Sequence, residues 1–566
     1  MQQVNYLSTL FLVPIAAIGV AAAIHATAYL HGEARAHLPR FWFFFLGTLL
    51  AMTLVVFSEG KLDFILFWEA MGLLSSGLVS FESKDKAARK ATWIYLLACH
   101  AGACALMLAG VILDRPGAFL AAFVLAIVGF GLKIGFPPFH VWLPEAHPAA
   151  PAPASAVMSG AMIPLGFYGL LTFFWPTITV VPFAATASTL LLVFGALAAL
   201  GGIAFALPQT NLKKLLAFSS VENMGVIAIG LGLATASRHA SPETAAISSF
   251  AFAGALIHVL NHAFLKGALF LGAGSVLRQT GTLDQDRLGG LMKRMPKTGT
   301  LFTLNALGLA GLPPLNGFLG ELLIYTAAFL SVKSGVPSLI AAGLATLAIL
   351  ALTGGLATAA YLKAIGATFL GEPRSREAAE AVETPRRMYL AQLLLFTCSL
   401  AMIPLSVFLG GRLTDGAATP ILSVAAAAGV ITAILAALLV GVRRFLTPRG
   451  AVKPALPTWD CGYHAPTARM AYTATAFTQP LADLLRPILK PRRHLIAFKG
   501  HPSAPTDAAL ATETDDRALA GFWRPLFTKI ARGFQLAHLF QNGSLHFYVL
   551  VLLLAVIALL IAAFVL

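Results

Sequence analysis

The chain is 566 residues long, and 58% of its residues are hydrophobic while only 11% are charged. A typical soluble chain is about 25% charged, so this composition excludes a soluble enzyme built around one apolar core. Apolar runs long enough to cross a bilayer recur along nearly the whole length, which predicts an all-α, polytopic membrane protein. The net charge of +15 lies mostly between these runs, so it indicates membrane topology and anionic lipid rather than nucleic acid.

The cysteines and the first apolar run narrow the class further. The four cysteines form no CxxC pair, so zinc, iron–sulfur and c-type haem sites would lack cysteine ligands, and we expect no metal or cofactor in this chain. The run at residues 5–30 is too long for the core of a cleavable signal and no basic segment precedes it, so it is predicted to be the first membrane helix.

About fourteen membrane helices are predicted from the apolar runs. They lie at residues 5–30, 41–58, 61–81, 91–113, 118–136, 151–173, 182–206, 215–235, 247–278, 298–332, 337–366, 388–410, 418–442 and 546–566. The sequence GLPPLNG at residues 311–317 interrupts one of them. Irregular backbone at membrane depth must be buried in protein or line a wet cavity, so one broken helix is expected at 298–332.

The Lys and Arg residues support this helix count. With a single broken helix at 298–332, most of them fall on one side of the membrane, and the positive-inside rule places that side in the cytoplasm and the N-terminus outside. We therefore divide the chain into a membrane domain at 1–446, a basic cytoplasmic tail at 447–545 and a terminal membrane helix at 546–566. Within the tail, residues 521–540 mix aromatic, apolar and basic residues, which is typical of an amphipathic helix on a membrane or a partner subunit.

Ionisable residues inside apolar runs are the candidate functional groups, because a charge at the bilayer centre costs about 2.5–3.5 kcal/mol on insertion scales. Glu69 lies eight residues into such a run. A hydrogen-bonded core acid is the alternative, but nothing nearby in the sequence neutralises it. Glu321 directly follows the GLPPLNG break, and a buried acid beside a broken helix is the pattern of an ion path.

Three titratable residues share one helical stripe. His258, His262 and Lys266 are spaced i, i+4 and i+8, so they lie along one face of a helix and could form a proton-conducting file with water. Metal binding by the two histidines is the rival interpretation. We rate it lower, because the sequence supplies neither an HExxH acid nor a third ligand.

A second group surrounds Lys133, which is closely followed by two prolines that disrupt its helix. A desolvated lysine exchanges its proton more readily than an exposed one, so Lys133 is a pathway candidate. His140, Glu145 and His147 follow in a Pro-rich segment, where a turn or cap role is about as probable as a role in proton uptake. Glu222 is a further candidate, with pairing to Lys213 or Lys214 as its alternative.

Four segments carry a family resemblance. KIGFPPFHVWLPEAHPAAPAPASAVMSGAMI, LKKLLAFSSVENMG, HVLNHAFLKGALFLGAGSV and GLPPLNGFLGE occur in that order and resemble the antiporter-like subunits of respiratory complex I and of Mrp-type cation/proton antiporters. SSVENMG, MSGAMI, MKRMP and the tail motif TWDCGYHAPTARMAYTATAFTQPL are most similar to the hydrogenase-4 component B and formate hydrogenlyase branch. The resemblance spans nearly the whole chain and implies an antiporter-like inverted-repeat fold with discontinuous helices.

By motif, the resemblance assigns several of these residues to the family's line of charges at the membrane midplane. Glu69 matches the glutamate of its fifth helix, Lys133 the lysine of its seventh, Lys266 the lysine that follows the histidines, and Glu321 the distal acid of the broken helix. Two departures follow. Glu69 lies in the third predicted helix, so the family's first two helices have no counterpart here, and Pro164 stands where relatives carry the lysine of the MSGxMIK pattern.

The resemblance implies a proton- or Na⁺-translocating subunit of a redox complex in a bacterial or archaeal cytoplasmic membrane. Its partners would be other membrane subunits and peripheral hydrogenase-like subunits that hold the Ni–Fe and Fe–S centres. The alternatives are a subunit of a cation/proton antiporter or inorganic-carbon uptake system without a redox partner, and a structural subunit whose pump is impaired by the missing lysine at Pro164.

Overall fold

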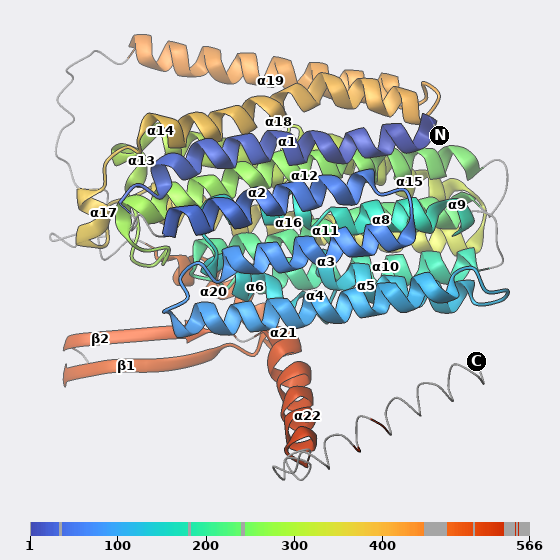
Figure 1. The fold of residues 1–566 in the computed structure, drawn as a ribbon. Helices are drawn as coiled ribbons and strands as arrows, with labels where there is room; N and C mark the ends of the chain where they lie inside the picture. Colours follow the sequence, from blue (N-terminus) through green and yellow to red (C-terminus); the bar gives the residue numbers. More distant parts are fainter. Residues whose placement is uncertain are drawn as a thin grey trace. The chain divides into compact units, whose positions relative to one another are not determined.

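The computed structural model describes residues 2–32, 37–178, 183–238, 244–446, 472–501, 504–514, 516–536, 550 and 553. Long helices run side by side through the membrane portion (Figure 1). Its longer helices are α1 Gln2–Tyr29, α2 His37–Phe57, α3 Lys61–Val79, α4 Lys86–Ile112, α5 Phe119–Ile134, α10 Ala184–Ala206, α11 Leu212–Arg238, α12 Ala245–Thr280, α14 Pro296–Leu309, α15 Gly317–Lys333, α16 Pro337–Phe369, α18 Arg386–Leu413 and α19 Thr419–Leu446.

Short segments join and interrupt these helices. They are the 3₁₀ turn η1 Phe139–Trp142, α6 Leu143–Ala149, α7 Ala152–Val157, the π-helix η2 Met158–Met162, α8 Leu165–Phe173, α9 Trp175–Ile178, α13 Leu291–Arg294 and α17 Arg376–Glu380.

The predicted all-α membrane architecture is confirmed. Among the described residues, twelve helices are long and apolar enough to cross a membrane. The predicted span 298–332 is present as α14 and α15, each shorter than eighteen residues, with the GLPPLNG segment between them. The predicted helix 546–566 lies almost entirely outside the described residues.

Helices α11 and α12 form the centre of the bundle. The most apolar part of α11 is completely buried, and α12 is nearly so. Helix α10 approaches α11 closely because small residues line the contact: a Cβ added at Gly202 would lie 2.4 Å from the backbone nitrogen of Glu222. Small residues are the usual means by which membrane helices pack this tightly. The two most protected helices therefore carry Glu222 and the His258–Lys266 stripe.

Both predicted interruptions are real breaks. Helix α5 ends at Ile134, and the freed carbonyl of Leu132 accepts a hydrogen bond of 2.6 Å from the indole N–H of Trp142. Helix α14 ends at Leu309, and Gly311 has a left-handed backbone with φ +69°. Freed backbone groups at membrane depth need such internal partners.

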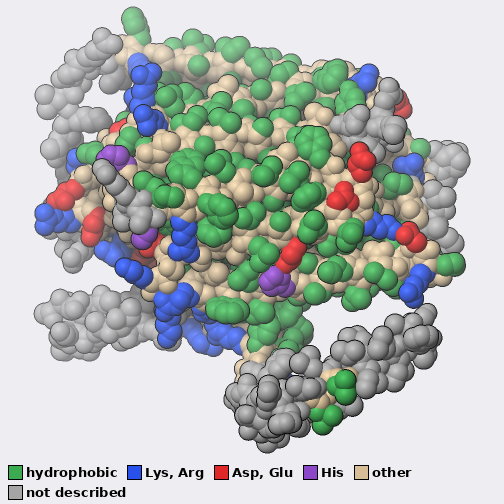
Figure 2. All heavy atoms as spheres, in the orientation of Figure 1, with side chains coloured by type: hydrophobic (Ala, Val, Ile, Leu, Met, Phe, Trp, Pro, Cys, Tyr) green, Lys and Arg blue, Asp and Glu red, His purple; other side chains and the backbone are tan. Residues whose placement is uncertain are grey.

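Charged side chains concentrate where the loops join the helices. Figure 2 shows Lys and Arg gathered at the end of the bundle where α13 and α17 lie, with hydrophobic side chains over the middle of the face. At that end, Glu383 caps α14 by accepting hydrogen bonds of 2.7 Å from the backbone N–H of Lys297 and the hydroxyl of Thr298. A carboxylate at a helix N-terminus satisfies free N–H groups and complements the helix dipole.

The described part of the tail is not purely helical. It contains α20 Ala474–Leu484 and α21 Arg486–Leu489, followed by an antiparallel hairpin of β1 Arg492–His501 and β2 Ala504–Glu513. The prediction of an all-α chain therefore needs correction here. These segments carry no clear two-residue alternation of apolar and polar residues, and strand pairing is a contact that local patterns do not specify.

Asp286, in the loop after α12, holds the start of α20. Its carboxylate accepts hydrogen bonds from the backbone N–H and the hydroxyl of Thr475, at 3.0 and 2.5 Å. Residues 515–566 form a separate compact unit, in which η5 Leu519–Trp523 and α22 Arg524–Leu536 occupy much of the predicted amphipathic stretch 521–540. The first part of the tail motif, TWDCGYHAPTARMA, lies outside the described residues.

Candidate functional site

Lys266 lies at the centre of the candidate site, completely buried on α12. Its ammonium donates to the backbone carbonyl of Leu216 at 2.9 Å, to the hydroxyl of Ser219, and to the hydroxyl of Tyr361 at 3.4 Å. These acceptors come from α11 and α16, and none of them is a carboxylate. Lys266 is therefore held by neutral groups that can accept its hydrogen bonds without fixing its charge.

One side chain links the histidine stripe to a buried acid. The amide N–H₂ of Asn223 donates to Glu222 at 2.5 Å, while its carbonyl oxygen lies 3.1 Å from Nε2 of His258. We assign the proton to Nε2 because an amide oxygen accepts and does not donate. Glu222, Asn223 and His258 thus form one hydrogen-bonded file across α11 and α12.

The alternative interpretations of these residues fare differently. Lys213 donates to the carbonyl of Ala150 at 2.7 Å, and the partner of the Glu222 carboxylate is Asn223, so the expected pairing of Glu222 with Lys213 is not present. Within the described residues, no group of three or more His, Cys, Asp and Glu side chains is arranged to hold a metal ion. His258 uses Nε2 for Asn223 instead.

Glu321 is half-buried in the first turns of α15, beside the break. Its carboxylate folds back over Gly311, so that a Cβ added there would lie 2.8 Å from Oε2. The break is attached to the histidine helix by a reciprocal pair: Asn316 donates to the side chain of Asn261 at 2.9 Å, and Asn261 donates to the carbonyl of Asn316 at 2.7 Å. The broken helix is thereby fixed against the helix that carries Lys266.

This packing predicts a specific effect of Gly311→Ala. The new methyl group should displace the Glu321 carboxylate and lower ion flux about tenfold, beyond the cost of about 1–2 kcal/mol that any left-handed alanine incurs. Gly335→Ala is the matched control, because Gly335 also has a left-handed backbone, φ +74°, but nothing lies within 4 Å of its added Cβ. Proton flux into vesicles that contain the purified protein measures both. Equal flux in the two variants would show that the position of Glu321 is unimportant.

Lys133 occupies a second buried site, at the end of α5. Its ammonium lies 3.4 Å from the hydroxyl of Tyr95 and 3.3 Å from the thiol of Cys99, and 5.7 Å from the ring centre of Trp68. A cavity of about 10 Å³ adjoins it, close to the space that one water molecule requires. A cation held by a phenol, a thiol and an aromatic face is poorly compensated, which suits a group that releases and rebinds a proton.

Glu69 does not contact Lys133. Its carboxylate is paired with Nδ1 of His100 on α4, and the side chains of His100 and Glu69 are 50% and 26% exposed. Our sequence interpretation did not select His100, although it is an ionisable residue within an apolar run, and the same signal that singled out Glu69 would have found it.

The Pro-rich segment gives mixed results. Glu145 forms an exposed ion pair with Lys90 at 3.3 Å, which favours a structural role. His140 is buried near the ring of Phe218. His147 is completely buried beside the ring of Phe270, and within the described residues neither of its ring nitrogens has a hydrogen-bond partner.

Two further buried lysines act at helix ends. Lys363 donates to the carbonyls of Leu207 and Gln209, just beyond α10, as Lys213 does beyond α6. A cation at the C-terminal end of a helix satisfies free carbonyls and complements the dipole. We interpret both lysines as structural caps.

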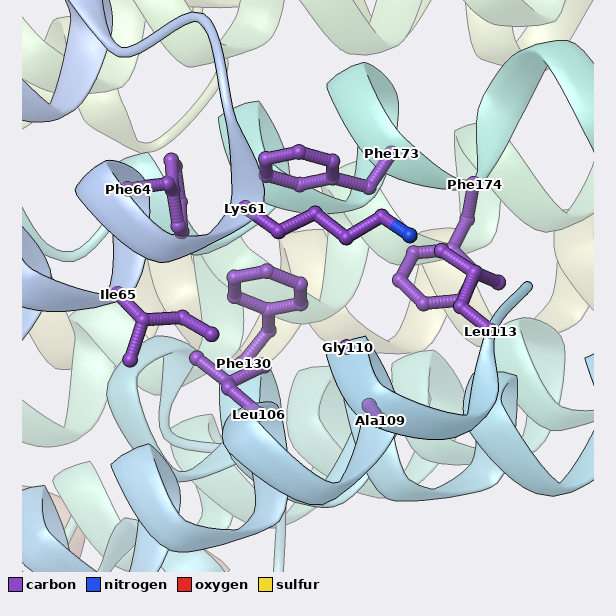
Figure 3. A pocket seen from close by; sticks show the side chains of 10 residues that line it. All are labelled: Lys61, Phe64, Ile65, Leu106, Ala109, Gly110, Leu113, Phe130, Phe173 and Phe174. Carbon is purple, nitrogen blue, oxygen red and sulfur yellow. The ribbon is translucent and has the colours of Figure 1, made fainter. Parts of the chain in front are cut away.

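An apolar pocket lies apart from these groups. It is lined largely by Phe and aliphatic side chains of α3, α4, α5 and α8, and Lys61 is the one charged residue among those that line it. Figure 3 shows the Lys61 side chain extending between Phe130 and Phe173; its ammonium pairs with Asp114 at 2.5 Å. Nothing polar among the lining residues continues from this pocket toward Lys133, so it offers no ion path.

The comparison with known proteins identifies the family. Residues 58–350 match the transmembrane family of NADH:quinone oxidoreductase and Mrp antiporter proteins. The chain belongs to this family. It is 31% identical to hydrogenase-4 component B of Escherichia coli K12, over 99% of this chain and 88% of that protein.

Other members of the NADH:quinone oxidoreductase and Mrp antiporter family match over shorter stretches. Formate hydrogenlyase subunit 3 of Escherichia coli K12 is 34% identical over 66% of this chain and 61% of its own length. A Na⁺/H⁺ antiporter protein of Alkalihalophilus pseudofirmus, the first-lettered component of its system, is 35% identical over 57% of this chain and 42% of its own length.

Solved structures share the fold of this family member. A chain of the archaeal membrane-bound sulfane sulfur reductase aligns with a TM-score of 0.74 and 22% identity, over 98% of this chain and 88% of that chain. A chain of the Mrp complex from Dietzia sp. aligns with a TM-score of 0.59 and 20% identity, over 74% and 85%. The predicted family and its antiporter-like fold are confirmed.

Proposed function

We propose that this chain is the proton-translocating, or Na⁺-translocating, membrane subunit of a redox-driven complex of the hydrogenase-4 or formate hydrogenlyase type. The observation that carries the proposal is the group of Lys266, Glu222, Asn223 and His258, buried together in the two most protected helices. Titratable groups are expensive inside a membrane and mark ion paths when they face the bundle interior. The broken helix with Glu321, fixed against α12, supports the same function.

In this proposal, the chain moves ions and its partners supply the energy. The partners are other membrane subunits and peripheral subunits with Ni–Fe and Fe–S centres, and this chain binds no redox cofactor itself. The similarity to hydrogenase-4 component B over nearly the full length of both chains supports this assignment.

Membership of a cation/proton antiporter or inorganic-carbon uptake system that lacks redox partners is the second candidate. The 35% identity to the Na⁺/H⁺ antiporter protein of Alkalihalophilus pseudofirmus favours it, although that similarity covers less of both chains.

Purification of the complex from native membranes through a tag on this chain separates the two candidates. We expect iron–sulfur subunits to co-purify together with a large subunit of the nickel–iron hydrogenase type. If only small membrane subunits accompany the chain, the antiporter assignment is correct and the redox-driven one is wrong.

We further propose that the chain lies in the cytoplasmic membrane with its N-terminus outside. The gathering of Lys and Arg around α13 and α17 supports this orientation under the positive-inside rule. A cysteine introduced by Gly335→Cys should therefore react with a membrane-impermeant maleimide added to intact cells, whereas Gly371→Cys should react only after the cells are opened. The reverse pattern would invert the topology.

A further inference from the structure

Pro164 interrupts the helix that links the two halves of the candidate path. It follows the π-helix η2, in which the N–H of Ile163 donates to the carbonyl of Met158 at 3.0 Å. Because proline has no N–H, the helix cannot continue its hydrogen bonds through this position, and π-turns of this kind are frequent at functional sites. Pro164 also provides no cation where the family pattern has a lysine.

A buried pair of hydroxyl groups lies one turn before Pro164. The hydroxyl of Ser159, in η2, is 2.8 Å from the hydroxyl of Ser220, in α11, and both side chains are completely buried. Ser220 also donates to the carbonyl of Leu216 at 2.9 Å. That carbonyl is the one that accepts from Lys266, so Ser159 is connected to Lys266 through two intermediate groups.

The same π-helix contacts the Lys133 site on its other side. The sulfur of Met162 lies 3.7 Å from the hydroxyl of Tyr95. That hydroxyl accepts from Lys133 at 3.4 Å and is 2.6 Å from the hydroxyl of Ser75. Helix η2 therefore carries a contact with the Lys133 site and, three residues earlier in the chain, a contact with the Lys266 site.

We propose that the Ser159–Ser220 hydroxyl pair carries the proton between the Lys133 and Lys266 sites, in place of the lysine that Pro164 lacks. This inference rests on the proposed function. A hydroxyl both donates and accepts, so each serine binds an incoming proton on a lone pair as its own O–H bond breaks toward the next acceptor. Rotation of the hydroxyl then restores the starting arrangement. Water must complete the step between Tyr95 and Ser159, because a thioether carries no proton.

This arrangement differs from a lysine in one respect. A lysine can store a proton at the midpoint, whereas a serine can only pass it on, so the two lysines remain the storage sites. No net charge is then held at η2, which avoids the cost of a third buried cation.

Proton flux through the purified complex in lipid vesicles tests the proposal, with a valinomycin-induced potassium diffusion potential as the driving force. Ser159→Ala and Ser220→Ala should each lower the flux about tenfold, in keeping with the loss of one buried hydrogen bond. Ser237→Ala is the matched control, because Ser237 is equally buried on α11 and donates only within its own helix, to Leu233. Ser220→Thr keeps a hydroxyl and should retain most of the flux.

Each outcome decides between the claims. Flux that is unchanged in both alanine variants overturns the hydroxyl relay while leaving the proposed function intact. A loss that Ser220→Thr shares fully with Ser220→Ala indicates a packing role and also overturns the relay. If the unsubstituted complex conducts no protons, the proposed function itself fails.

Discussion

Lys266→Met should abolish proton flux through the assembled complex, by about 100-fold or more, the scale typical of a positioned acid–base group. Lys266 is the cation at which α11, α12 and α16 meet, and within the described residues its hydrogen bonds go only to Leu216, Ser219 and Tyr361. Methionine fills nearly the same volume but can neither hold nor pass a proton. Flux under a potassium diffusion potential measures the loss, and the co-purification yield reports assembly.

Lys333→Met is the control for this experiment. Lys333 ends α15, outside the buried group, and its ammonium lies over the ring of Phe329. We expect flux close to that of the unsubstituted complex. Comparable flux in Lys266→Met and Lys333→Met would remove Lys266 from the path.

Lys133→Met should also abolish flux, yet leave the protein at least as stable to heat. The ammonium of Lys133 is buried with a phenol, a thiol and an aromatic ring as its neighbours, so its desolvation is poorly compensated. Removing such a group relieves that cost, which is the usual trade between activity and stability at a functional site. Thermal unfolding of the purified complex, followed together with flux, measures both effects.

Lys363→Met provides the contrasting case. Lys363 is as buried as Lys133, but it donates to two backbone carbonyls. Its replacement leaves buried acceptors without a donor, which costs about 1–3 kcal/mol, so the unfolding temperature should fall. If Lys133→Met destabilises the protein as much as Lys363→Met, Lys133 is a structural residue.

The sequence alone supports much of the fold and part of the site. Long apolar runs and the GLPPLNG interruption predict the helices and the α14–α15 break, because both are local properties of the chain. The spacing of His258, His262 and Lys266 likewise places them on one helical face. These features need no knowledge of which helices are neighbours.

The partners of those residues could not be predicted, because they depend on how helices pack. Nothing local shows that Asn223 joins Glu222 to His258, or that His100 pairs with Glu69. The cap roles of Lys213 and Lys363 also require the carbonyls of other helices, and the hairpin at 492–513 requires pairing between two segments. Such contacts are fixed by tertiary packing rather than by local pattern.

Pro164 shows why a single missing charge does not decide the function. Taken only as a lost lysine, it favours a structural subunit with an impaired pump. In the fold, it ends a π-helix whose Ser159 and Met162 contact the Lys266 and Lys133 sites. The position is therefore altered, and the surrounding hydroxyl groups supply a different connection.

The central claim is that this chain moves ions at the expense of redox chemistry in its partners. The most direct test is proton movement by the native complex in sealed vesicles while its own redox reaction proceeds, without added sodium and with an uncoupler as control. The account predicts proton movement that the uncoupler abolishes and that Lys266→Met prevents. Sustained electron transfer with no movement of protons, and none of sodium when sodium is supplied, would contradict it.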